Sequence, residues 1–184
     1  MTVRLGQNGN GCSPTGHGAG EGARTLPCGP LALVLGFGNV LLSDDGAGVK
    51  LTERLRGELG PETADFVDGG TLSFSLLPYL EATDSMLVID AAELNRPSGA
   101  VALFEGAAMD EFLISTRRRS VHEVGLIDLL DMARLQGCLP RRRALLCIQP
   151  CRIDWSETLS TSVAQALPEA ARQAQVLLQR WALR

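Results

Sequence analysis

Two short runs of this sequence are apolar along almost their whole length, and they set the strongest limit on the fold. They are Leu31–Gly36 and Ser85–Ala91, the latter reading SMLVIDA. Continuous apolar runs of this length are typical of strands buried on both faces, as in a parallel sheet that is covered by helices. Both runs therefore predict central strands of an α/β domain.

The remainder of the chain alternates between strand-like and helix-like segments. Further strands are expected at Ala64–Val67, Ala100–Phe104 and Ala144–Ile148. Apolar periodicity predicts helices at Gly46–Leu59, Leu72–Leu80, Val121–Leu135 and Thr158–Trp181. This alternation indicates a single α/β domain with a twisted, mostly parallel sheet of about five strands and helices on both faces.

The first thirty residues differ from the rest in composition. Residues 1–30 carry eight of the twenty glycines and few apolar clusters. Such a segment cannot bury enough surface to order itself, so it is expected to be a flexible Gly/Pro-rich arm. The folded domain is expected to span residues 31–184.

Charge and composition exclude several classes of function. A net charge of −4 and a pI near 5.2 argue against nucleic-acid binding. The arginine clusters at 117–119 and 141–143 either contact an acidic partner or, as we favour, are solvated loop charge. No apolar stretch is long enough to insert into a membrane. Five cysteines without a CxxC pair indicate a reducing, cytoplasmic location.

The loop after the first run, GFGNVLLSDDGAG, resembles a phosphate-binding turn but departs from it. A dinucleotide-binding loop has the pattern Gly-x-Gly-x-x-Gly, and Leu41 stands where the third glycine belongs. The adjacent carboxylates of Asp44 and Asp45 would also repel a pyrophosphate. A nucleotide-dependent enzyme is therefore a disfavoured alternative.

The two aspartates invite different interpretations. Aspartate is favoured at a helix N-cap, and Asp44 is the better candidate for that structural role. Asp45 is the better candidate for function. Asp90, at the end of the apolar run LVID, is costly to bury unless it meets a cation, a hydrogen-bond donor or water.

His122, in SVHEVGL, is the only histidine outside the arm. Alone it is as compatible with an ordinary helix residue as with a functional one. Because the carboxyl ends of parallel strands form one edge, Asp45 and Asp90 with one imidazole make a plausible open site for a divalent transition metal. His122 would approach this edge from the start of its helix, so the loop at 117–120 is expected to lie over the edge.

Four blocks in this order, GFGNVLLSDDGAG, DGGT, LVIDA and SVHEVGL, resemble the hydrogenase maturation endopeptidases. This resemblance covers Leu31 to about Pro150 and implies a twisted sheet flanked by helices. It also implies an enzyme that removes the C-terminal extension from the nickel-loaded large-subunit precursor of a nickel–iron hydrogenase, its partner.

The resemblance carries the family's nickel-contacting and catalytic positions onto Asp45, Asp90 and His122. The nickel would be supplied by the precursor, and other divalent metals could take its place in crystals. Binding of the substrate is expected from a further set: Asn39, Asp68, Gly69, Gly70 and Thr71. Asp68 is equally compatible with an Asp-Gly turn.

The same ligands would serve a second kind of protein. A metal-dependent chaperone that checks nickel loading of the precursor without cleaving it would need no other residues. The sequence leaves this alternative open.

Overall fold

The computed structural model describes residues 32–70, 76–116 and 121–183, with the backbone alone for residues 116 and 121–124. The expected arm, residues 1–30, and the loop at 117–120 lie outside the described residues. None of the helices in the described part combines the length and apolar character needed to cross a membrane.

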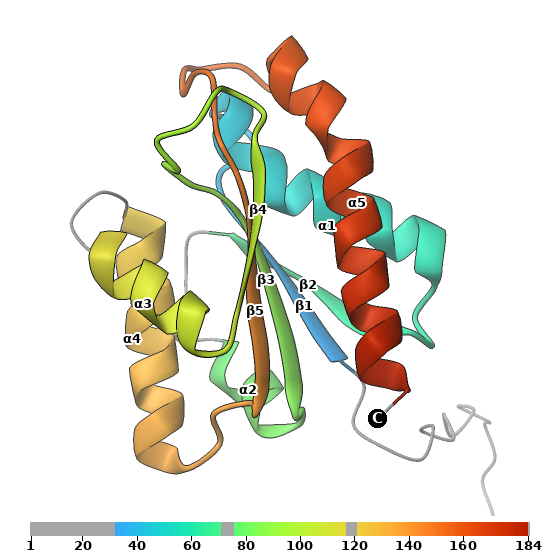
Figure 1. Cartoon of the computed structure of the whole chain (residues 1–184), viewed down its shortest axis with the longest axis vertical. Coiled ribbons are helices and arrows are strands. Elements are labelled where there is room, and N and C mark those ends of the chain that lie inside the picture. Colours follow the sequence, from blue (N-terminus) through green and yellow to red (C-terminus); the bar gives the residue numbers. More distant parts are fainter. Residues whose placement is uncertain (1–31, 71–75, 117–120, 184) are drawn as a thin grey trace, which may run out of the picture.

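Five strands form one sheet, in the order β2-β1-β3-β5-β4 (Figure 1). All neighbouring strands are parallel except β4, which pairs antiparallel with β5 at the edge. The predicted mostly parallel sheet is therefore confirmed. The strands are β1 (Ala32–Phe37), β2 (Ala64–Gly70), β3 (Ser85–Ala91), β4 (Val101–Glu105) and β5 (Arg142–Ile148).

Helices cover both faces of this sheet (Figure 1). One face packs on α1 and α5, and the other on α2, α3 and α4. The helices are α1 (Ala47–Leu59), α2 (Leu77–Glu81), α3 (Ala107–Thr116), α4 (Val121–Gln136) and α5 (Thr161–Ala182), with a 3-10 turn, η1 (Ser43–Gly46), before α1.

The central strands are those that the two apolar runs predict. β1 lies between β2 and β3, with Val34 opposite Leu87 and Leu35 opposite Val88. These four side chains are fully buried. Burial on both faces explains why neither strand alternates between apolar and polar residues.

One helix was not predicted, namely α3. Its ten residues, AAMDEFLIST, are mostly apolar without a clear polar stripe, so their periodicity does not distinguish a helix from a strand. Tertiary contacts hold α3 in place: the guanidinium of Arg143 on β5 donates hydrogen bonds to both carboxylate oxygens of Asp110, at 3.1 and 2.5 Å. The interpretation of residues 141–143 as solvated loop charge is therefore wrong for Arg143.

The direction of α4 decides where its first turn lies. Its last turn leads to Arg142 at the start of β5, at the amino edge of the sheet. A 16-residue helix is about 24 Å long. Traced backward from its last turn, α4 extends along the sheet, so its first turn lies toward the carboxyl ends of the strands (Figure 1).

Candidate active site

Four parallel strands end at one edge of the sheet, which we call the carboxyl edge. The pairings of Phe37 with Gly70 and of Ala91 with Ile148 mark this edge. Ligands of open α/β sheets bind beyond such an edge. The turn after β1, the start of α1 and the loop after β5 all lie here (Figure 1).

The glycines of the loop after β1 allow α1 to sit directly on the strand ends. A Cβ atom at Gly48 would lie 2.3 Å from the carbonyl oxygen of Ile89 and 2.4 Å from that of Phe37. A Cβ at Gly36 would lie 2.7 Å from the carbonyl oxygen of Gly48. These glycines therefore serve helix–strand packing, which explains why the loop resembles a nucleotide-binding turn.

The same packing fixes Asp45, on η1. A Cβ at Gly38, whose φ is +123°, would lie 1.9 Å from the carbonyl oxygen of Asp45, so only glycine allows this approach. The Asp45 side chain is 7% exposed, and its Oδ2 accepts a hydrogen bond from the backbone N–H of Asn39 at 2.8 Å. Asp45 is thus a buried carboxylate held in one orientation at the carboxyl edge.

Asp90 reaches the same edge from β3, which contacts η1. It pairs with Cys147 of β5 and is buried. Opposite residues of parallel strands point to the same face, and Cys147 belongs to the core on the α3 and α4 side. The side chain of Asp90 therefore points to the face that α4 covers.

His122 lies in the first turn of α4, whose backbone alone is described. This turn is at the end of α4 nearer the carboxyl edge, on the face to which Asp90 points. The structure thus places Asp45 and Asp90 at the carboxyl edge, and the first turn of α4, with the backbone of His122, toward the same end of the sheet. The convergence of the three side chains on one ion stays a prediction.

The donors at this edge suit a first-row transition metal in kind. Asp45 and Asp90 offer carboxylate oxygens, and an imidazole would complete a set without thiolates. Within the described side chains, which exclude that of His122, no three His, Cys, Asp or Glu residues form a group that could hold a metal. A metal site at this edge would therefore need a further ligand from outside this set.

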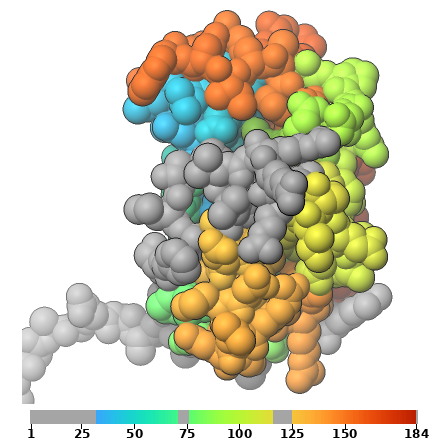
Figure 2. All heavy atoms as spheres, turned by 90° about the vertical axis from the view of Figure 1, so that its left-hand side faces the viewer, coloured from blue at the N-terminus to red at the C-terminus, as the bar shows by residue number. Residues whose placement is uncertain are grey.

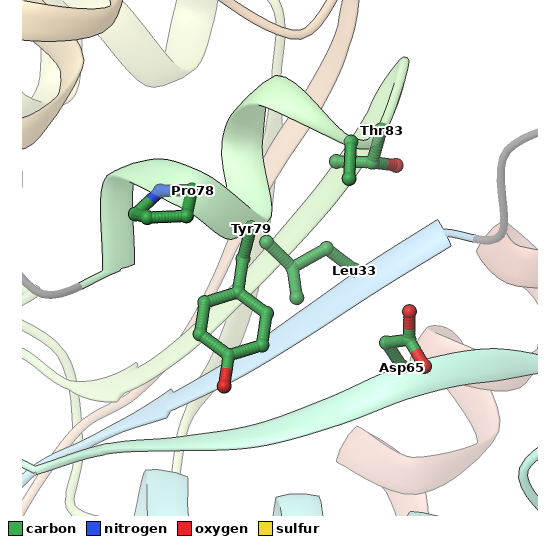
Figure 3. A pocket seen from close by; sticks show the side chains of 6 residues that line it. Leu33, Asp65, Pro78, Tyr79 and Thr83 are labelled. Atoms are coloured by element: carbon green, nitrogen blue, oxygen red, sulfur yellow. The ribbon is translucent and has the colours of Figure 1, made fainter.

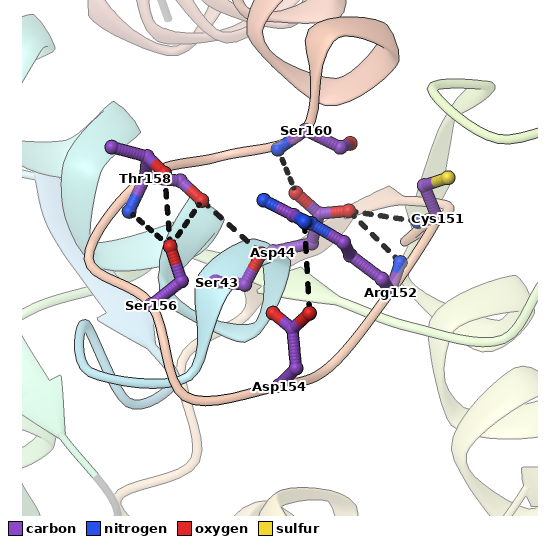
Figure 4. A network of polar contacts seen from close by, with 8 residues as sticks. All are labelled: Ser43, Asp44, Cys151, Arg152, Asp154, Ser156, Thr158 and Ser160. Atoms are coloured by element: carbon purple, nitrogen blue, oxygen red, sulfur yellow. Dashed lines mark hydrogen bonds and ion pairs between the residues drawn. The ribbon is translucent and has the colours of Figure 1, made fainter.

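Asp44 does not have the role that its sequence position suggests. The N-cap of α1 is Gly46, and no side chain caps that helix, so the capping assignment is wrong. The fully buried carboxylate of Asp44 instead accepts hydrogen bonds from the backbone N–H groups of Cys151 at 2.9 Å, Arg152 at 3.1 Å and Ser160 at 2.6 Å (Figure 4). It anchors both ends of the loop after β5.

These contacts also set the charge of Asp44. Burial favours the neutral acid and would raise the pKa, but hydrogen bonds from Ser160, Cys151 and Arg152 together outweigh it. The pKa of Asp44 is therefore lower than usual, and the side chain is an anion whose partners are backbone N–H groups.

Ser43 adds further contacts to the same loop. Its φ is 54°, the left-handed region that non-glycine residues rarely adopt. The Ser43 backbone N–H donates to the Ser156 carbonyl at 2.6 Å, and its hydroxyl donates to the Thr158 carbonyl at 3.1 Å (Figure 4). The loop after β5 is therefore fixed to η1 along its length.

The predicted substrate-binding residues border this region. The Asn39 side-chain oxygen accepts from the Leu41 N–H at 3.0 Å. Asp68, at the end of β2, is exposed, and its Oδ1 accepts from the Gly70 N–H at 2.8 Å, as expected for an Asp-Gly turn. Gly69 is the extra residue where the β1–β2 register shifts. Thr71 lies outside the described residues, and substrate contact by this set stays a prediction.

Sequence reasoning missed Gln149, a second organising residue of the carboxyl edge. Its buried side chain accepts a hydrogen bond from the Leu94 N–H at 2.7 Å and donates one to Glu93 at 3.2 Å. It thereby joins the loop after β3 to the end of β5. A polar residue directly after an apolar strand, as at Asp90, is the signal that could have identified it.

A small pocket lies at the opposite, amino edge and is not the site. It has a volume of about 160 Å³ and is lined mainly by apolar atoms. Leu33 and Asp65, near the starts of β1 and β2, line it together with Tyr79 (Figure 3). Its position, far along both strands from Asp45, separates it from the carboxylates.

The family model described as hydrogenase maturation protease (HycI) matches residues 49–176, which is more than half of the chain. The hydrogenase expression/formation protein HoxM of Cupriavidus necator is 31% identical over 82% of this chain and 75% of its own length. The hydrogenase 2 maturation protease of Escherichia coli is 30% identical over 77% of this chain and 86% of its own length.

Solved structures agree with these sequence matches. The hydrogenase maturating endopeptidase HybD of E. coli superposes with a TM-score of 0.75 at 27% identity, covering 82% of this chain and 93% of its own. The [NiFe] hydrogenase maturation protease HybD of Thermococcus kodakarensis superposes with a TM-score of 0.70 at 28% identity. The match covers 80% of this chain and 99% of that structure. The chain is therefore an endopeptidase that belongs to the hydrogenase maturation protease family.

Proposed function

We propose that this endopeptidase removes the C-terminal extension of the large-subunit precursor of a nickel–iron hydrogenase after nickel has been inserted. The observation that supports this proposal is the pair of buried carboxylates, Asp45 and Asp90, at the carboxyl edge; His122 would join them from the first turn of α4. Family membership supports the reaction class, and these residues supply the site.

The proposed metal ligands would allow the enzyme to recognise nickel that is already bound to the precursor. Two carboxylates and an imidazole bind a first-row metal, but without thiolates they would not remove it from cysteines of the precursor. A nickel ion so placed can polarise the scissile carbonyl or a water. Asp45 and Asp90 would bind the ion from the enzyme side, and the hydrogen bond from Asn39 holds Asp45 in orientation.

The nickel of the precursor would make this enzyme selective for loaded precursor over other proteins. Competence for cleavage would arrive with the nickel of the substrate, so the enzyme would leave unfolded proteins intact. Maturation of this kind would take place in the cytoplasm, where the precursor is made.

The decisive experiment uses the purified full-length chain with three substrates: nickel-loaded precursor, unloaded precursor and casein. We expect a shortened large subunit from the loaded precursor only, detected by mass spectrometry. Cleavage of casein at a comparable rate would overturn the proposed selectivity. Binding of loaded precursor without any shortened product would favour a loading-checking role in place of cleavage.

A further inference from the structure

Four apolar side chains are exposed on two loops at the carboxyl edge. We call them the edge patch: Val40, Leu41, Ile153 and Trp155, of which Trp155 is 82% exposed. Single exposed apolar residues are common on protein surfaces, but an exposed tryptophan with aliphatic neighbours is not. The edge patch therefore needs a physical explanation.

The two loops that carry the edge patch are joined to each other. Leu42 and Ser156 form a parallel β-bridge, in which the Ser156 N–H donates to the Leu41 carbonyl at 3.0 Å. Leu41 and Trp155 each precede a bridge residue, so they are neighbours on adjacent segments, which in a sheet lie about 4.8 Å apart. Figure 2 shows the orange atoms of the loop after β5 beside the light blue atoms of the turn after β1.

Hydrogen bonds to η1 hold the loop that presents Ile153 and Trp155 on both sides of these residues. Asp44 holds it at Cys151, Arg152 and Ser160, and Ser43 holds it at Ser156 and Thr158, as described above. A preorganised loop loses little conformational freedom when it binds a partner. Tryptophan is one of the residue types that are enriched among the hot spots of protein interfaces.

The residues around the edge patch resemble the polar rim of a protein–protein interface. Arg152 and Asp154 flank Ile153 and are paired at 3.6 Å, both about half exposed. An apolar centre with a polar, solvent-accessible rim is typical of a protein–protein contact. The edge patch thus suits a folded protein surface that carries its own apolar residues.

Its position identifies the occupant. Asp44, which anchors the patch loop, directly precedes Asp45 of the proposed active site. A protein whose C-terminal extension enters that site would come close to the edge patch. We propose that the edge patch binds the folded part of the large-subunit precursor beside its extension, with Trp155 as the main contact; this inference rests on the proposed function.

The test compares Trp155→Ala and Leu41→Ser with Leu135→Ala. Leu135 is a matched control because it is 87% exposed but lies in the last turn of α4, toward the amino edge. The dissociation constant for nickel-loaded precursor is measured by titration calorimetry at low temperature. Cleavage of the precursor is followed in a separate assay by gel electrophoresis. Melting temperature and oligomeric state are recorded for each variant.

We expect Trp155→Ala to raise the dissociation constant and the KM at least tenfold, Leu41→Ser about threefold and Leu135→Ala less than twofold. The kcat at saturation and the melting temperatures should stay unchanged. Unchanged binding by Trp155→Ala, while wild type cleaves normally, would overturn the edge patch and leave the proposed function intact.

Two further outcomes separate the proposals. If wild type binds the precursor without cleaving it and Trp155→Ala loses binding, the edge patch stands and the proposed cleavage fails. If Trp155→Ala converts a dimer to a monomer but binds precursor normally, the patch joins two copies of this chain and the proposal is wrong. Absence of binding by wild type would overturn both.

Discussion

Asp44 Oδ1 accepts a hydrogen bond from the backbone N–H of Ser160 at 2.6 Å, across 116 positions of sequence. Ser160 is the N-cap of α5, so this contact fixes the start of the C-terminal helix to the turn after β1. Asp45, one residue further, holds the Asn39 turn instead. Two adjacent carboxylates therefore have separate contacts, one anchoring the loop after β5 and one holding the turn after β1.

The first prediction concerns the stability contributed by Asp44. Replacing it with alanine leaves three backbone N–H groups without their acceptor, so Asp44→Ala should lower the free energy of unfolding by about 3 kcal/mol. The matched control is Asp131→Ala, which removes only an exposed pair with Arg134 and should cost less than about 0.5 kcal/mol. Urea denaturation measures both, and equal losses would contradict the anchoring role.

The second prediction is a pH dependence of stability. The pKa of Asp44 is lower in the folded protein than its ordinary value, which is about 3.9 in an unfolded chain. Above about pH 5 both states are ionised and the stabilisation is complete. As the pH falls through about 3.9, the unfolded state takes up a proton first, so stability decreases until the folded carboxylate is protonated as well.

Denaturation of wild type and Asp44→Asn between about pH 3 and pH 7 checks this. The slope of stability against pH should be smaller in Asp44→Asn. It should not vanish, because an ion pair and hydrogen bond from Arg143 also lower the pKa of Asp110. Identical slopes in the two proteins would show that the charge of Asp44 does not stabilise the fold.

The third prediction uses two glycines of one helix. Gly48→Ala places a Cβ against the carbonyl oxygens of Ile89 and Phe37, which should force α1 outward and cost about 3 kcal/mol. Gly57→Ala, where a Cβ meets nothing within 4 Å, should instead stabilise the protein by about 0.5–1 kcal/mol through helix propensity. Opposite changes in melting temperature are expected, and a loss in both variants would refute the packing argument.

The fourth prediction concerns the proposed ligands. Asp45→Ala, Asp90→Ala and His122→Ala should each abolish processing of nickel-loaded precursor, since each removes a metal donor, while circular dichroism stays native. Asp44→Ala should keep part of its activity at temperatures where it is folded. Full activity of Asp45→Ala with complete loss in Asp44→Ala would show that the two aspartates have been assigned in the wrong order.

The sequence determined which segments form the central strands and which polar residues end them. Apolar runs such as Ser85–Ala91 predict central strands because a strand buried on both faces is apolar along most of its length. Polar residues that end such runs, as Asp90 does, lie at the carboxyl edge as a consequence of parallel pairing. These features are local in sequence or follow from topology, so they could be predicted without coordinates.

Only the tertiary structure decided what the neighbouring residues contact. Asp44 has the local pattern of a helix cap, but its partners at Cys151, Arg152 and Ser160 are more than one hundred positions away, where no local pattern can indicate them. The helix α3 is likewise held by the ion pair between Asp110 and Arg143 rather than by its own periodicity. Contacts between distant segments form when the sheet brings the loops together, so they depend on the whole fold.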